Sequence, residues 1–182
     1  MMMRTFIYTS ALTIGWGVVV FAQTPDYVSP FLGAFEAGIL CAQEPSGIRE
    51  APDTVAGTTH VIDTSPDFVN TGRVVPAVIG IGFGVLSGMG NVGQDGILMT
   101  VTHPPLEGSG VTQQSFMTSI GSSDEPGLTF YQFDEDYELA LGEWRMTATT
   151  AGAPLYEVTF TVVPPAALPE LAGACGYLDL LS

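Results

Sequence analysis

The segment LYEVTFTVV, Leu155–Val163, alternates apolar and polar side chains along its length. Such a period of two is typical of a strand with one buried face. The apolar side chains that would share that face are Tyr156, Val158, Phe160 and Val162. Glu143–Thr150 also favours a strand, and the turn residues Ala151–Pro154 separate it from the first segment. Together they predict a β-hairpin.

Most of the remaining chain also favours short strands. They are expected at Phe31–Leu40, Thr58–Asp63, Val78–Leu86, Ile97–Thr102, Val111–Ile120 and Leu128–Phe133. Loops are expected at Gln43–Gly57, Gly88–Gly96 and Ser122–Gly127. A short helix is expected only within Ala166–Leu181, where Pro169 and Gly173 weaken the pattern. Seven to nine short strands separated by turns predict an all-β fold, an antiparallel immunoglobulin-like β-sandwich with a short C-terminal tail.

The N-terminus has the pattern of a secretory signal peptide. Met1–Thr5 carries one base, Arg4, and no charge follows up to Phe21. This uncharged run is short for a membrane span, which needs roughly 20 residues. We therefore expect residues 1–22 to be a signal peptide cleaved after Ala22, with no stable membrane insertion afterwards. The alternative is an uncleaved anchor. The expected location is periplasmic or secreted.

Residues 23–182 are expected to form a single domain, with 164–182 as its tail, because a chain of this size can bury one sizeable core. The protein is acidic, with 19 acidic residues, four arginines, no lysine and a formal net charge of −15. This composition excludes binding to nucleic acid through phosphates, which requires clustered bases. It also disfavours anionic partners in general.

The chain has two cysteines, Cys41 and Cys175, which lie 134 positions apart near the ends of the expected domain. In an oxidising compartment they would form a disulfide that joins the first long strand to the tail. The alternative is two buried thiols that do not meet. A catalytic cysteine is disfavoured because neither belongs to a CxxC motif.

The only metal-binding pattern is weak. The carboxylates of Asp134, Asp136 and Glu138 alternate in the run DEDYE and could share one face of an extended segment, where they would offer oxygen ligands to a cation. His103 could add an imidazole if folding brought it close. The more economical interpretation is a solvated surface turn. We therefore expect no cofactor and keep these four residues as weak metal candidates.

No catalytic motif is evident either. The match to GxGxxG at Gly88–Gly93 follows a predicted strand, but another strand follows it instead of the helix that a dinucleotide site requires. No GxSxG nucleophile elbow occurs in the sequence. We expect the protein not to be an enzyme.

A structural motif follows the acidic run. Tyr137 would sit at a strand corner with its ring inward and its hydroxyl bonded to the backbone, and Gly142 and Trp144 would open the next strand. Trp144 is expected in the core, with Arg145 facing outward. The pattern explains stability and not activity.

The chain also resembles a bacterial family, the domain of unknown function 3859. The residues that carry the resemblance are Gly33, Phe35, Glu36 and Gly38, then Thr102–Pro105, then Phe133, Asp134, Glu138, Leu139 and Gly142–Trp144. It would cover about residues 30–163. It implies an exported immunoglobulin-like domain and assigns no catalytic residues.

The resulting functional hypothesis is an exported, non-enzymatic domain that binds a protein, a glycan or an envelope component. Its binding surface would be a sheet face or the loops at one end of the sandwich, including Gly88–Gly96 and Ser122–Gly127. The glycine-rich face of Val78–Leu86 could accept close packing from another chain or from the tail. The alternative is a metal-binding protein or cation-dependent enzyme that uses the acidic turn at 134–138.

Overall fold

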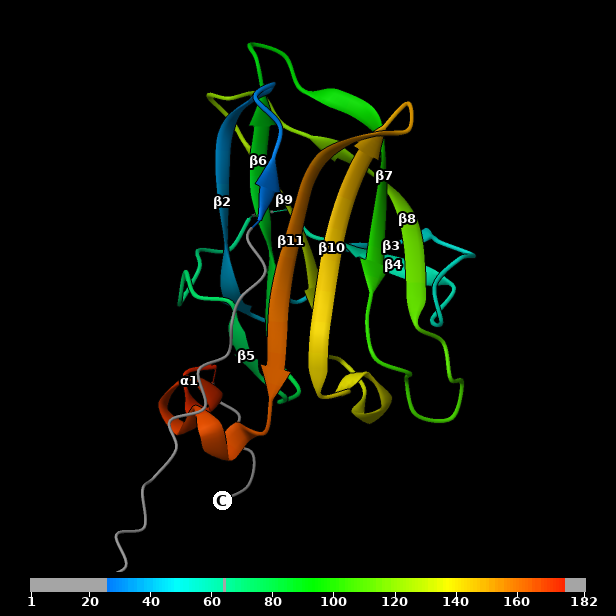
Figure 1. Cartoon of the computed structure of the whole chain (residues 1–182), viewed down its shortest axis with the longest axis vertical. Helices are drawn as coiled ribbons and strands as arrows, with labels where there is room; N and C mark the ends of the chain where they lie inside the picture. The colour runs from blue at the N-terminus through cyan, green and yellow to red at the C-terminus, as the bar shows by residue number, and fades with distance from the viewer. Residues whose placement is uncertain (1–25, 64, 176–182) are drawn as a thin grey trace, which may run out of the picture.

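The computed structural model describes residues 26–63 and 65–175 as two facing β-sheets with a small helical end (Figure 1). The predicted hairpin is present as β10 (Gly142–Thr150) and β11 (Ala153–Val163), paired from Gly142–Val162 to Thr150–Ala153. It lies within the larger sheet, whose strand order is β1-β11-β10-β7-β8. The other strands of that sheet are β1 (Tyr27–Val28), β7 (Gln94–Thr102), β8 (Gln113–Ile120) and β5 (Val74–Pro76), which runs parallel to β11.

The second sheet has the order β2-β6-β9 and is antiparallel throughout. Its strands are β2 (Leu32–Cys41), β6 (Ile81–Met89) and β9 (Gly127–Gln132). The core lies between the sheets, where Phe83 of β6 packs against Trp144 and Phe160 of the hairpin. The alternating side chains of both sheets meet there, so the predicted antiparallel β-sandwich is confirmed.

A third, two-stranded sheet lies outside the sandwich. It consists of β3 (Gly47–Glu50) and β4 (Thr58–Val61) and lies beside the edge that carries β7 and β8 (Figure 1). The prediction of a loop over Gln43–Gly57 was therefore wrong. Every residue of β3 is exposed, so the strand has no buried face and no apolar alternation to reveal it. Its pairing with β4 holds it in place.

The tail contains a 3-10 turn at Pro165–Ala167 and a short helix α1 at Pro169–Gly173. Pro169 lies at the start of this helix, where a proline is tolerated, and Gly173 ends it. The helix is thus shorter than the expected range of Ala166–Leu181, of which residues 176–181 lie outside the described residues. No helix in the described part of the chain is long and apolar enough to cross a membrane. The expected signal peptide, residues 1–22, also lies outside the described residues.

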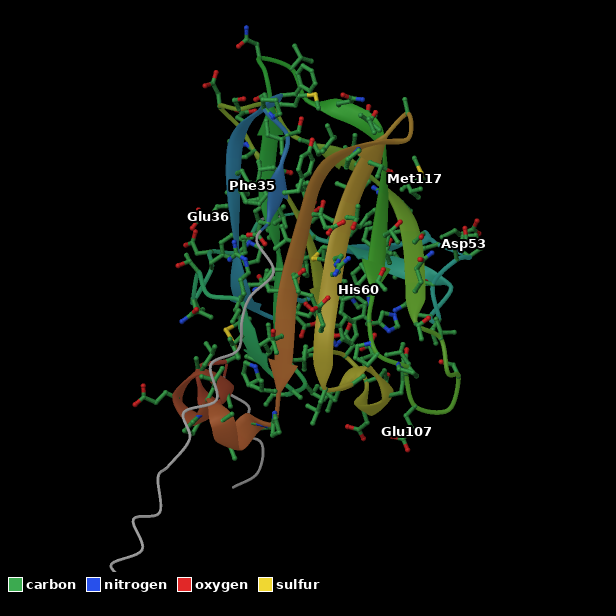
Figure 2. The ribbon with its side chains drawn as sticks, viewed as in Figure 1. Phe35, Glu36, Asp53, His60, Glu107 and Met117 are labelled. Atoms are coloured by element: carbon green, nitrogen blue, oxygen red, sulfur yellow. A yellow bond between two sulfur atoms is a disulfide. The ribbon has the colours of Figure 1, made fainter. Side chains whose placement is uncertain are left out.

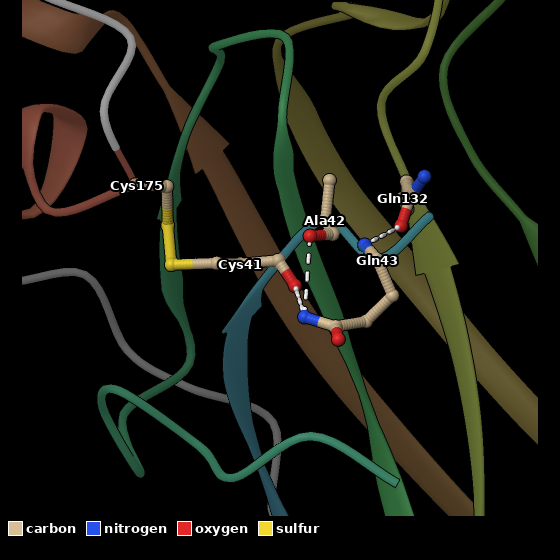
Figure 3. The surroundings of a disulfide bond; sticks show 5 residues. All are labelled: Cys41, Ala42, Gln43, Gln132 and Cys175. Carbon is tan, nitrogen blue, oxygen red and sulfur yellow. Dashed lines mark hydrogen bonds between the residues drawn. A yellow bond between two sulfur atoms is a disulfide. The ribbon is translucent and has the colours of Figure 1, made fainter. Parts of the chain in front are cut away.

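The expected disulfide is present and joins the end of β2 to the tail (Figure 3). Cys41 and Cys175 are bonded, with their Cα atoms 5.2 Å apart. Beside the disulfide, the side-chain amide of Gln43 donates to the Cys41 carbonyl at 3.0 Å, and the Gln43 backbone N–H donates to the Gln132 side chain on β9, also at 3.0 Å. The link thus stands at the point where the chain leaves β2 for the β3–β4 hairpin.

The glycine-rich face of β6 is covered, contrary to the idea that it accepts another chain. A Cβ atom added at Gly84 would lie 2.5 Å from the Cβ atom of Phe130 and from the carbonyl oxygen of Thr129, both on β9. At Gly82 it would lie 2.9 Å from the side chain of Leu40. The flanking strands close over these glycines, so their lack of a side chain serves packing within the sheet.

Candidate binding cleft

A cleft opens on one side of the sandwich, between the two edge strands β8 and β9. The two strands meet through the hydroxyl groups of Thr118 and Thr129, whose oxygens are 3.3 Å apart. Around this contact is a half-open hollow of about 190 Å³. We call it the side cleft. Its walls come from both sheets, so its shape depends on how they stack.

The β3–β4 hairpin covers the side cleft, and we call it the flap. The Ser115 N–H of β8 donates to the Asp53 carbonyl at 3.1 Å, and the Val55 N–H donates to the Gln114 side chain at 2.8 Å. Figure 2 shows Asp53 at the outer end of the flap, on the same side of the molecule as Met117 of β8. A few hydrogen bonds thus hold the flap against β8.

The floor of the side cleft contains a buried hydrogen-bond network centred on Gln114. Nδ1 of His103 lies 2.8 Å from the Pro104 carbonyl oxygen, so this nitrogen carries the proton and Nε2 is an acceptor. The Gln114 amide nitrogen donates to that Nε2 and to the Tyr131 hydroxyl oxygen, each at 3.2 Å. With its oxygen bound to the N–H of Val55, the Gln114 side chain is held at both ends.

The network continues from Tyr131 to the acidic turn. The Tyr131 hydroxyl donates to Oε1 of Glu138 at 2.7 Å. Oε2 of Glu138 accepts the backbone N–H groups of Asp134 at 2.7 Å and Glu135 at 3.0 Å. Glu138 thus turns inward from the 3-10 turn Asp136–Glu138 and caps its start. This carboxylate fixes the turn beside the side cleft.

Burial governs the titration of the network. It raises the pKa of the Glu138 carboxyl, while the bonds from Tyr131 and the two backbone N–H groups lower it in part. Burial, helped by the nearby Glu138 charge, raises the pKa of Tyr131. Burial lowers the pKa of His103, and the hydrogen bond to the Pro104 carbonyl, which raises this pKa, offsets only part of the effect. His103 is therefore neutral at pH 7, and hydrogen bonds, not charge pairs, hold the floor.

The rim of the side cleft is polar and comes largely from the flap. Its flap residues are Arg49, Thr54, Thr58, Thr59 and His60. Nδ1 of His60 lies 3.5 Å from Oδ2 of Asp134, whose other oxygen accepts the Gln132 amide at 2.7 Å. Phe116, Phe130 and Tyr131 add aromatic carbon to the lining. The arrangement offers hydroxyl, guanidinium and amide groups above a rigid floor.

The four weak metal candidates do not form one cluster. His103 and Glu138 belong to the same network, but Gln114 and Tyr131 lie between them. Asp134 instead lies beside His60, which is not one of these four residues. Within residues 26–63 and 65–175, no group of three or more acidic, histidine or cysteine side chains is placed to hold a metal ion.

The residues of the corner motif lie in the 3-10 turn and at the start of β10. Trp144 is fully buried, and its indole donates to the Ala140 carbonyl at 2.8 Å. Gly142 has a φ of 132° and opens β10. Tyr137 packs against the core, but its hydroxyl makes no backbone hydrogen bond within the described part of the chain. The tyrosine hydroxyl that matters is that of Tyr131.

Sequence reasoning missed Gln114 and Tyr131. Gln114 lies in a polar run at the start of β8, which reads as a solvent-facing strand end, although its side chain is buried. Tyr131 was placed in an aromatic strand with no partner for its hydroxyl. Neither position carries a pattern in a single sequence that would distinguish it from ordinary packing.

Comparison with known proteins gives a family and similar solved structures. The model of a family described as "Domain of unknown function (DUF3859)" matches residues 28–162. The chain is similar to an immunoglobulin-like protein from Pseudomonas aeruginosa, with 19% sequence identity and a TM-score of 0.47, over 78% of this chain and 99% of that one. No curated protein has a matching sequence.

Proposed function

The chain belongs to the family of the domain of unknown function DUF3859, and from this premise we propose that it is an exported, non-enzymatic binding domain that takes a glycan into the side cleft. The observation that carries the proposal is the side cleft itself. A floor of mutually bonded buried groups lies beneath a rim of hydroxyl, amide and guanidinium groups. Such a site is preorganised, which reduces the cost of ordering it on binding.

The size and chemistry of the side cleft favour a glycan over a protein. A sugar ring presents hydroxyl groups around its edge and carbon–hydrogen faces, and small-molecule sites combine aromatic walls with a few placed polar groups. The cleft of about 190 Å³ offers threonine hydroxyls together with the half-buried ring of Phe116. A stable protein interface buries about 800 Å² on each partner, far more surface than this hollow presents.

Two features support export and a non-enzymatic role. The Cys41–Cys175 disulfide is typical of proteins from oxidising compartments, in agreement with the expected signal peptide. The buried titratable groups are already engaged within the fold, because both ring nitrogens of His103 and both oxygens of Glu138 have hydrogen-bond partners. Their role in the proposal is therefore to hold the floor.

The test is binding to a glycan array, followed by calorimetry on each glycan that binds. Thr58→Trp places a large side chain on the rim, while Thr147→Trp adds the same bulk on β10 outside the side cleft. We expect wild type and Thr147→Trp to bind the same glycans and Thr58→Trp to lose them. Equal binding by Thr58→Trp, or no glycan bound by the wild type, would contradict the proposal.

A second candidate is a metal-binding protein or cation-dependent enzyme that uses the acidic turn at 134–138. One contact favours it, the 3.5 Å approach of His60 to Asp134, since an imidazole and a carboxylate are common metal ligands. Metal analysis of the purified protein tests it. This candidate requires stoichiometric metal that is lost in Asp134→Asn and retained in Asp124→Asn.

A further inference from the structure

We propose that the glycan bound in the side cleft is acidic and that its carboxylate pairs with Arg49. This inference rests on the proposed function and names the ligand class of the same site. The arginines are the only strongly basic side chains in a chain of formal net charge −15.

Three arginines lie in the described part of the chain, and two of them are engaged. Arg73 pairs with Asp26 at 3.1 Å and donates to the Ala37 carbonyl at 2.6 Å. Arg145 pairs with Glu143 at 2.8 Å. Arg49 makes no ion pair and no side-chain hydrogen bond with any residue in 26–63 or 65–175. The unengaged arginine is the one on the rim of the side cleft.

The position of Arg49 suits a ligand that enters beneath the flap. Arg49 lies on β3 directly opposite Thr59 on β4, and both line the side cleft. A guanidinium group binds a carboxylate through two parallel hydrogen bonds, which fixes orientation as well as attraction. The hydroxyl of Thr59, which shares a face of the flap with Arg49, is then available to a hydroxyl group of the same sugar unit.

The acidity of the whole chain does not oppose this pairing at short range. At physiological ionic strength charges are screened over about 8 Å, so distant carboxylates act weakly on a ligand in direct contact with Arg49. The rim carboxylate of Asp134 is occupied by His60 and by the Gln132 amide. An acidic sugar therefore meets a free cation where it enters.

The experiment compares each acidic oligosaccharide with its own uncharged form. Oligomers of galacturonate, glucuronate and mannuronate are titrated calorimetrically into the purified protein, and each is then replaced by its methyl ester, which keeps the ring and removes the charge. Arg49→Gln and Arg49→Lys are measured beside Arg145→Gln, a matched loss of a surface arginine outside the side cleft.

We expect at least one uronate to bind about tenfold or more tightly than its methyl ester, as befits a charge-assisted bond. Arg49→Gln should abolish that difference, Arg49→Lys should retain part of it, and Arg145→Gln should leave it unchanged. Esters that bind as tightly as acids, or an unaltered preference in Arg49→Gln, would overturn the inference. So would binding in the side cleft by neutral glycans alone, which would leave the proposed function standing. Failure of every glycan on the array would refute the proposed function itself.

Discussion

Removing the Tyr131 hydroxyl tests the buried network directly. In Tyr131→Phe the ring is kept, so its packing on Phe83 and Trp144, at centroid distances of 6.0 and 5.0 Å, is preserved. Glu138 loses one of its three donors, and Gln114 loses an acceptor for its amide. A buried polar group left without its partner costs about 1–3 kcal/mol, so we expect a loss of about 2 kcal/mol. For a domain of this size that lowers Tm by about 4–8 °C.

The loss should also depend on pH. Burial raises the pKa of Glu138 above its unfolded value, and the Tyr131 bond opposes that rise. Without the bond the pKa rises further in the folded state. A group with a raised folded pKa stabilises the protein at low pH, and this contribution disappears as the pH increases through that pKa. The deficit of Tyr131→Phe relative to wild type should therefore be larger at pH 8 than at pH 4.5.

The measurement is urea unfolding followed by the fluorescence of the buried Trp144, with the disulfide intact, at both pH values. Tyr137→Phe is the matched control, because the Tyr137 hydroxyl has no side-chain hydrogen bond to a described residue; it should cost less than about 0.5 kcal/mol. A deficit below that value for Tyr131→Phe, or one that stays constant or shrinks as the pH rises, would refute the reasoning.

Three further outcomes are expected. Replacing Cys41 and Cys175 with serine should cost up to about 5 kcal/mol from loop-closure entropy, seen as a lower urea midpoint; an unchanged midpoint would speak against it. Gly84→Ala should cost about 1–3 kcal/mol in urea unfolding, since its Cβ would lie 2.5 Å from that of Phe130, and a neutral result would mean that β9 gives way. Because burial lowers the pKa of His103, wild type should lose stability as the pH falls from 7 to 5.5, when the unfolded chain takes up the proton. His103→Gln should show a flatter profile, and parallel profiles would exclude this histidine as the cause.

Sequence patterns predicted the strands in which apolar and polar side chains alternate, because only one face of these strands is buried. The hairpin of β10 and β11 was anticipated nearly to its ends, because Trp144 and Phe160 alternate with polar residues on strands inside the larger sheet. β3 was missed because it is exposed on all sides. β5 was missed because it has three residues and depends on a parallel neighbour far along the chain.

The site was less predictable than the fold because it depends on pairs distant in sequence. His103 and Glu138 were noticed for their chemistry, but the sequence could not show that Gln114 and Tyr131 lie between them. The flap brings His60 to Asp134 from a separate sheet. Residue types indicated which groups could act, whereas only the stacking of β8 against β9 shows which of them meet.

Because the β3–β4 sheet lies outside the sandwich, its residues can vary independently of the two sandwich sheets. The excursion that carries the flap leaves the sandwich and returns at neighbouring points, since the Ala42 N–H donates to the Gly80 carbonyl and the Val69 N–H to the Ile39 carbonyl, both at 2.8 Å. Its residues can be exchanged without altering the framework, much as recognition loops vary on a constant scaffold. Randomising positions 47–61 is therefore the natural route to new ligand preferences, with the two sandwich sheets left unchanged.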